Sequence, residues 1–132
     1  MYKPFGTYGR AGAQYRQIDI TTRVEGASPH RLVAILYEEL LGAIATMGQA
    51  IRIGDVARRG ESQSKALAIV GGLEEGLDFD KGGEIAEMLM KIYAEVKRLL
   101  IRAAREADMA ASDAARKLVG EIATAWGAIS GA

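Results

Sequence analysis

The sequence contains no cysteine and carries no net charge, and each absence narrows the possible functions. Without cysteine the chain can form neither disulfides nor thiolate metal sites. Its 17 basic residues balance 17 acidic ones, so it lacks the basic excess typical of surfaces for nucleic acid or anionic membranes. No apolar run approaches the roughly 20 residues of a membrane-spanning helix, and the N-terminus lacks the apolar core of a signal peptide. We therefore expect a cytoplasmic protein with no nucleic-acid partner and no membrane insertion.

Residues suited to catalysis or metal binding are scarce. The sole histidine, His30, lies in the first turn of a predicted helix, and one histidine cannot build a histidine-based zinc site. We expect it to be a surface or capping residue. No Glu-x-x-His pair of a di-iron bundle is present. We therefore expect no enzymatic activity, no metal and no cofactor, and we interpret the carboxylate pairs as solvated helix faces and N-terminal charges: Glu38-Glu39, Glu74-Glu75, Glu84/Glu87 and Asp78/Asp80.

Two further motifs look like ligand-binding patterns but have simpler explanations. Residues 80–84 (DKGGE) suggest a glycine-rich anion loop, yet they lack the preceding strand and the Gly-Lys-Ser/Thr ending of a phosphate loop. A tight turn between helices explains them better. Arg98, Arg102 and Arg105 share one helix face, but glutamates lie among them and no aromatic residue interleaves for base stacking. We interpret this face as a salt-bridged exterior.

Helical periodicity is the strongest pattern in the chain. Ser28-Pro29 is typical of a helix start, because proline at the first helical position lacks an amide that would be unpaired there. Apolar residues then recur three or four positions apart. No segment shows the period-two alternation of a strand. Residues 28–132 therefore predict an all-α fold, an antiparallel up-down four-helix bundle with helices over about 29–53, 55–77, 82–105 and 108–128.

Residues 1–27 differ from this body. They contain four glycines and three of the five tyrosines, and they show no long apolar periodicity. We predict an N-terminal arm that is mostly extended, or that forms a short extra helix around Ala11–Ile18. The apolar residues Ile18, Ile20 and Val24 indicate that this arm packs on the body.

Small residues are unusually frequent, with 16 glycines in the chain and many alanines after residue 108. Small side chains let another helix approach closely or leave shallow grooves. Together with an apolar arm, this composition favours a body that exchanges an internal segment for a partner helix. The residues alone thus indicate a helical binding module.

Three motifs in order resemble one known family. They are YRQIDITTRVEGASPHRLVAILYEELL, which begins at Tyr15, then LDFDKGGEIAEML over 77–89, and finally Ala125-Trp126. The spacing of ASPHRL and LDFDKGGEIA over nearly the whole chain resembles FliS, the family of flagellin-specific secretion chaperones. The resemblance implies a cytoplasmic chaperone that binds the C-terminal helical segment of flagellin, prevents premature polymerisation, and delivers flagellin to the flagellar type III export apparatus.

The resemblance also implies partners and a site. An arm that covers part of the binding surface and is displaced corresponds here to Tyr15, Ile18, Ile20 and Val24. Further partners that we consider are the export gate, other flagellar regulators and, for the free protein, a second copy in a homodimer. The alternative function is a helical adaptor that binds a different flagellar or regulatory protein. We predict a flagellin-binding groove lined by Ile69, Leu73, Ala111, Ala115, Leu118 and Ile122.

Overall fold

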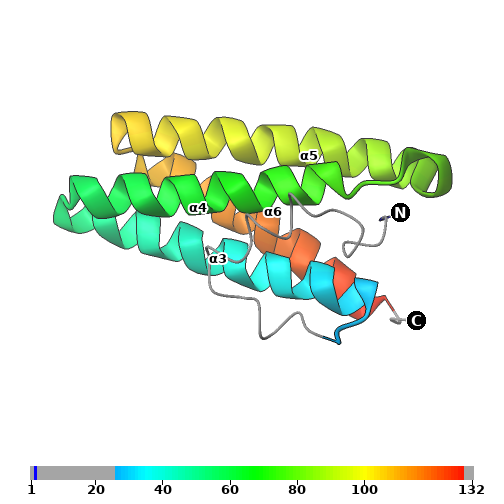
Figure 1. Ribbon diagram of the computed structural model, residues 1–132. Coiled ribbons are helices and arrows are strands. Elements are labelled where there is room, and N and C mark those ends of the chain that lie inside the picture. The colour runs from blue at the N-terminus through cyan, green and yellow to red at the C-terminus, as the bar shows by residue number, and fades with distance from the viewer. Residues whose placement is uncertain (1, 3–25, 130–132) are drawn as a thin grey trace.

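The computed structural model describes Tyr2 and residues 26–129, and within these residues the fold is entirely helical. Four helices follow one another: α3 (Pro29–Ile53), α4 (Val56–Glu75), α5 (Phe79–Glu106) and α6 (Met109–Ala128). Consecutive helices run in opposite directions, and each packs against the next, while α6 closes the ring by packing on α3 (Figure 1). The predicted all-α helical bundle is thereby confirmed.

Local chemistry explains where α3 and α4 begin. The Ser28 side chain accepts a hydrogen bond from the Arg31 amide at 3.1 Å, and Pro29 occupies the first turn. Gly54 ends α3 in the left-handed conformation, with φ at 74°. The next residue, Asp55, caps α4 by accepting from the Arg58 amide at 3.0 Å. The turn between these helices therefore consists of a C-cap followed directly by an N-cap.

Helix α5 begins at Phe79, three residues before the predicted start at 82, because the Asp78 carboxylate accepts from the amides of Asp80 and Lys81. Gly83 then interrupts the helix with φ 49° and ψ −124°, a conformation that side chains rarely adopt. Its first turn is therefore separated from the long remainder by a kink. At the other end, Ala107 adopts a left-handed conformation and Asp108 caps α6.

The core runs along the inside of all four helices. Its largest fully buried side chains include Tyr37 and Tyr93, and aliphatic residues surround them. Gly48 on α3 faces α6, where an added Cβ would lie 3.4 Å from the Ser112 hydroxyl oxygen and 3.7 Å from the terminal methyl carbon of Met109, which is ordinary van der Waals contact.

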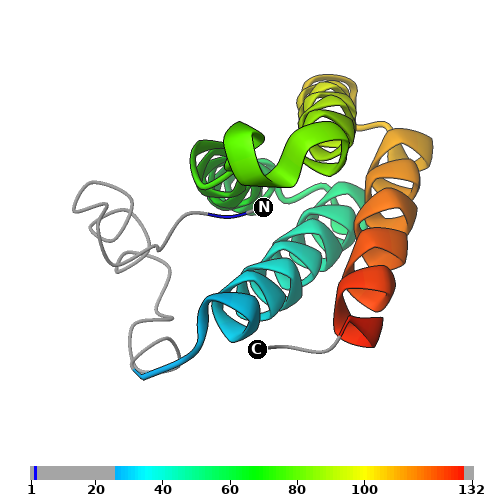
Figure 2. The same ribbon diagram turned by 90° about the vertical axis from the view of Figure 1, so that its right-hand side faces the viewer.

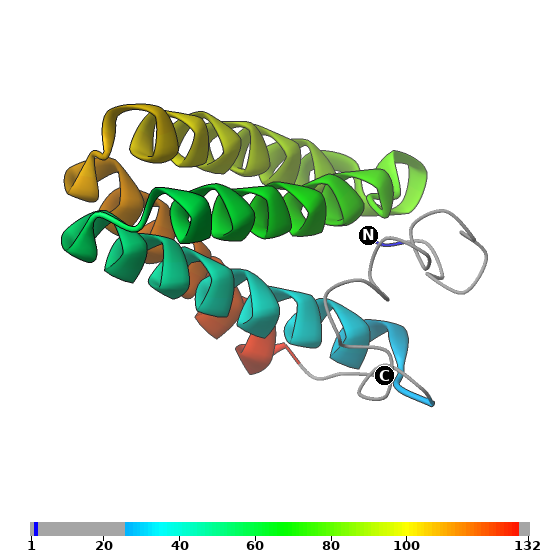
Figure 3. The same ribbon diagram turned by 60° about the vertical axis from the view of Figure 1, so that its left-hand side comes forward.

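The bundle is not equally tight along its length. Helices α4 and α5 lie side by side, whereas α3 and α6 lean away from them toward the end where α3 begins and α6 finishes (Figures 2 and 3). We call this the tyrosine end, because Tyr2 enters the bundle there. The opposite end, which holds the 54–55 and 107–108 turns and the arginines of residues 52–59 and 98–105, is called the arginine end.

Candidate functional site

Three tyrosine hydroxyls meet where the helices diverge. The Tyr93 hydroxyl on α5 lies 2.6 Å from that of Tyr37 on α3 and 2.5 Å from that of Tyr2. Burial is the main reason that the pKa values of Tyr37 and Tyr93 lie above the ordinary tyrosine value. The Tyr37 and Tyr93 hydroxyls therefore stay protonated at neutral pH, and together with the Tyr2 hydroxyl they form a hydrogen-bonded chain. This chain ties the start of the sequence to two helices.

Tyr2 was not among the residues that sequence reasoning selected. Its backbone forms an isolated antiparallel bridge with Leu77, and its ring meets Trp126 edge-on at 5.8 Å. The useful signal was indirect: buried tyrosine hydroxyls at 37 and 93 need polar partners. Nothing in the sequence around Tyr2 identifies it as that partner.

His30 belongs to the same end of the bundle. Its ring stacks on the indole of Trp126, with ring centres 4.8 Å apart, and its Nε2 lies 3.1 Å from the Trp126 carbonyl oxygen. In return the indole Nε1 donates to the His30 carbonyl at 2.9 Å. Ser28 caps the start of α3, whereas the half-buried His30 meets a carbonyl in the last turn of α6 and so joins α3 to α6. Among the described residues, no group of three His, Asp or Glu could hold a metal ion.

An apolar surface runs along the sides of α5 and α6 that face each other. Near the arginine end, Leu99 on α5 and Ala111 and Ala114 on α6 border one shallow groove, so these positions mark the facing sides. Positions 92, 88 and 85 lie on the same side of α5 as Leu99, because they precede it at helical spacing. For the same reason, positions 118, 122 and 129 lie on the same side of α6 as Ala111 and Ala114. We call these six side chains the α5–α6 strip: Ile85, Met88, Ile92, Leu118, Ile122 and Ile129.

The strip is exposed because the two helices separate. Ile85, Met88 and Ile129 are 49%, 54% and 49% exposed, while Ile92, Leu118 and Ile122 are half-buried against the core. Figure 2 looks at the tyrosine end and shows the start of α5 standing apart from the end of α6. Side chains that would pack together in a parallel-sided bundle are here left in contact with water. Such a surface suits an apolar partner.

The structure divides the predicted groove residues into two groups. Leu118 and Ile122 belong to the α5–α6 strip. Ile69 and Leu73 on α4, with Ala111 and Ala115 on α6, are at most 5% exposed and form part of the core, and Ala111 also borders the shallow groove between α5 and α6. The predicted arm residues, Tyr15, Ile18, Ile20 and Val24, lie outside the described residues.

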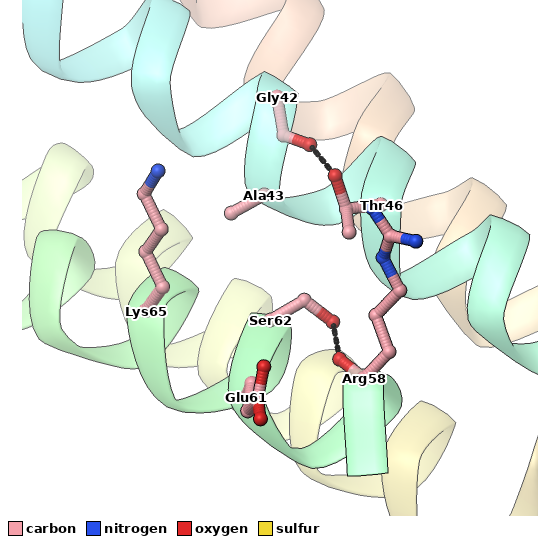
Figure 4. A pocket seen from close by; sticks show the side chains of 7 residues that line it. All are labelled: Gly42, Ala43, Thr46, Arg58, Glu61, Ser62 and Lys65. Carbon is pink, nitrogen blue, oxygen red and sulfur yellow. Dashed lines mark hydrogen bonds between the residues drawn. The ribbon is translucent and has the colours of Figure 1, made fainter. Parts of the chain in front are cut away.

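A second groove, of about 270 Å³, lies between α3 and α4 and is lined mainly by polar side chains (Figure 4). Its two hydroxyls point to backbone: Thr46 donates to the Gly42 carbonyl at 3.0 Å, and Ser62 donates to the Arg58 carbonyl at 2.8 Å. Lys65 pairs with Glu39 at 3.5 Å. The two hydroxyls and Lys65 are thus used within the protein, whereas Arg58 and Glu61, which also line the groove, form no ion pair with the described residues.

Helix α3, Pro29–Ile53, is long and apolar enough to cross a bilayer by length and composition. The sequence had led us to expect no segment of this kind. Half of its most apolar window is buried against the other helices. Its apolar residues therefore supply the core of the bundle, as Val33, Leu40 and Met47 show with 0% exposure.

A four-helix body with an exposed apolar strip defines a helical binding protein. The profile of the family described as "Flagellar protein FliS" matches residues 11–132. The flagellar secretion chaperone FliS of Salmonella typhimurium is 38% identical, over 88% of this chain and 87% of its own. The flagellar secretion chaperone FliSB of Pseudomonas aeruginosa is 33% identical, over 92% and 96%, and FliS of Escherichia coli K12 is 31% identical, over 90% and 89%. The chain belongs to the FliS family of flagellar secretion chaperones, which are not enzymes.

Proposed function

We propose that this chaperone binds the C-terminal helical segment of flagellin in the bacterial cytoplasm, prevents its premature polymerisation, and delivers it to the flagellar type III export apparatus. Membership of a family of flagellar secretion chaperones supports a flagellar client. A segment that will later bury its apolar face in a filament needs that face covered beforehand. The α5–α6 strip offers a surface for such cover.

The exposure of the α5–α6 strip is the observation that carries the proposal. An amphipathic helix presents apolar side chains at i, i+3, i+4 and i+7, and the usual receptor for it is an apolar groove between helices. Ile85, Met88 and Ile92 supply one side of the surface, and Leu118, Ile122 and Ile129 supply the other. The client helix then takes the place that a closer α5–α6 contact would occupy.

The other predicted site residues have distinct roles in this proposal. Ile69, Leu73, Ala111 and Ala115 support the strip from within the core. We further propose that the arm, through Tyr15, Ile18, Ile20 and Val24, covers part of the client surface in the free protein. Tyr2 gives this idea a physical anchor, because its contacts with Tyr93 and Trp126 bring the start of the arm to the tyrosine end.

Calorimetry with a flagellin C-terminal peptide tests the proposal. We expect one-to-one binding, a gain of peptide helix, and at least about tenfold weaker binding for Met88→Asp, because about 1.5–3 kcal/mol of apolar burial is lost. Ala45→Asp, on the exposed outer side of α3, is the matched control and should bind normally. A peptide that gives no heat with the folded wild-type protein would contradict the proposal. An equal loss of peptide affinity in both variants would show that the α5–α6 strip is not the binding surface.

A further inference from the structure

A shallow groove of about 260 Å³ lies at the arginine end, between the start of α4 and the end of α5. Val56 and Ile101 line this groove, and although both are apolar they are 65% and 45% exposed. Pockets for small molecules usually enclose roughly 300–1,000 Å³, so this groove is smaller than such a pocket. Its apolar surface therefore suits the side chains of another macromolecule.

The rim of this groove is positively charged. Arg59 and Arg105 are among its lining residues, none of which carries a carboxylate. Arg59 forms no ion pair with the described residues, whereas Arg105 lies 2.9 Å from the carboxylate of its neighbour Glu106. That pair is exposed to solvent and so contributes little. Both guanidinium groups are therefore available to the carboxylates of a partner.

The floor of the groove includes two small residues, one from each helix. Gly60 lies inside α4, and an added Cβ there would stand in open space. Glycine makes a helix less stable than alanine does, and no packing contact in the described part of the chain requires it at this position. Ala104 is the small residue that α5 contributes to the groove. Small side chains at these two positions let a third helix approach α4 and α5 closely.

The walls of the groove favour a partner that is itself a helix. Both walls are helices, whose backbone amides and carbonyls pair mostly within the helix, so the partner meets side chains. An extended segment would leave its own backbone groups unpaired over the apolar floor, and this costs free energy when they lose water. A helix pairs its backbone internally. An amphipathic helix with aspartates or glutamates beside its apolar face therefore matches both the floor and the rim.

Other occupants match the groove less well. Residues 1–25 contain four basic and two acidic residues, so the N-terminal segment of the chain has the same sign of charge as the rim. A single-stranded nucleic acid has the opposite sign, but its bases stack on aromatic side chains, and none is present among the lining residues. The charge and the apolar character of the groove together favour an acidic protein helix.

The groove and the α5–α6 strip lie on opposite sides of α5. Ile101 in the groove comes nine positions after Ile92 in the strip, which is about two and a half helical turns. We propose that the arginine-end groove is a second docking site, which holds an acidic amphipathic helix of another protein while the strip stays free for the client. Only the simultaneous binding of flagellin rests on the proposed function. The docking site itself does not depend on it.

Fluorescence anisotropy with a labelled synthetic peptide tests the docking site. The acidic probe is a helix of about 18 residues, or five turns, with leucines along one side and glutamates beside them. The control peptide has lysines in place of the glutamates. We expect the full chain to bind the acidic probe saturably with a Kd below about 1 mM, and the control at least about tenfold more weakly. Folded protein at about 1 mM that leaves the acidic probe unbound would overturn the proposal.

Variants of the groove then locate the site. Arg59→Glu/Arg105→Glu should bind the acidic probe at least about tenfold more weakly and should gain affinity for the lysine peptide. The matched control Arg116→Glu/Lys117→Glu makes the same change in net charge on the exposed side of α6 and should bind as wild type. Gly60→Leu fills the floor without changing the charge, so it should weaken binding while the helical circular dichroism signal persists. Equal losses of affinity in both charge variants would refute the assigned groove.

Further measurements identify the occupant. Saturating flagellin C-terminal peptide should leave the Kd of the acidic probe unchanged, and competition between the two peptides would contradict separate sites. A flagellin peptide that does not bind would contradict only the proposed function. If the acidic probe does not bind but a labelled single-stranded RNA binds through the same arginines, the occupant is a nucleic acid and the proposal is wrong. Self-association that Arg59→Glu/Arg105→Glu abolishes, again without binding of the probe, would assign the groove to a second copy.

Discussion

His30 and Trp126, which are 96 residues apart in the chain, are joined by a ring stack and two hydrogen bonds that run in opposite directions. This contact fixes the end of α6 to the start of α3. It lies where those two helices diverge from α4 and α5, so it determines how α6 is placed relative to α5. The exposure of the α5–α6 strip thus depends on a contact that contains none of its residues.

Two substitutions of Trp126 distinguish the stability that comes from its packing from the stability that comes from its indole hydrogen bond. Trp126→Phe keeps a ring against His30 but loses the indole donor, so we expect a loss of about 1 kcal/mol in the free energy of unfolding. Trp126→Ala also empties a buried site and should cost about 3–5 kcal/mol. Urea denaturation followed by circular dichroism measures both. Equal losses in the two variants would show that the hydrogen bond, and not the packing, dominates.

The tyrosine chain predicts unequal effects of removing one oxygen. Tyr93→Phe leaves the Tyr37 hydroxyl without its central partner and should cost about 1–3 kcal/mol. Adding Tyr37→Phe should then cost little more, because it removes the hydroxyl whose bond to Tyr93 is already lost. A double-mutant cycle measures this coupling. Strictly additive losses would contradict a shared hydrogen-bond chain.

The same tyrosines predict the alkaline limit of stability. Their pKa values are raised in the folded state, mainly by burial, so the folded protein holds protons that the unfolded chain releases above pH 10.0. Stability from this source is fully present below pH 10.0 and falls as the pH rises further. Ultraviolet titration should show two tyrosines that ionise only as helix is lost. Complete ionisation with the helical signal intact would disprove the burial argument.

Two glycines should respond oppositely to the same change. Gly54 ends α3 with φ at 74°, so Gly54→Ala forces a strained conformation and should lower the free energy of unfolding by about 1 kcal/mol. Gly42 lies inside α3 with open space around it, and Gly42→Ala should raise stability by about 0.5–1 kcal/mol. Thermal unfolding of both variants measures the two signs. Two shifts of the same sign would be inconsistent with the assigned turn.

Deleting residues 1–24 tests the proposed arm together with Tyr2. Removal of a covering segment should speed association with the flagellin peptide and expose apolar surface, with lower solubility as a consequence. Tyr2→Ala, which removes one anchor, should give part of the increase in rate. Stopped-flow fluorescence and thermal unfolding separate the outcomes. A loss of stability with an unchanged association rate would make the arm part of the core and not a cover.

The sequence predicted the features of this fold that depend on near neighbours. Ser28-Pro29 and the apolar spacing after it identify α3, because capping and amphipathicity act within one helix. The site could not be predicted in the same way. Ile69 and Ile122 occupy equivalent stripe positions on their own helices, yet Ile69 is fully buried and Ile122 is half-buried. The difference arises from the angle between helices, which contacts distant in sequence determine.

Cysteine protection measures the central claim, that the flagellin segment lies on the α5–α6 strip, most directly. The chain has no native cysteine, so single thiols can be placed by Met88→Cys and Ile129→Cys on the strip and by Ala45→Cys on the outer side of α3. With saturating flagellin C-terminal peptide, alkylation at 88 and 129 should slow by about tenfold or more, because only the small fraction of protein without bound peptide reacts there. The rate of alkylation at position 45 should not change. Unchanged rates at 88 and 129 with peptide bound, or equal protection at 45, would contradict the account.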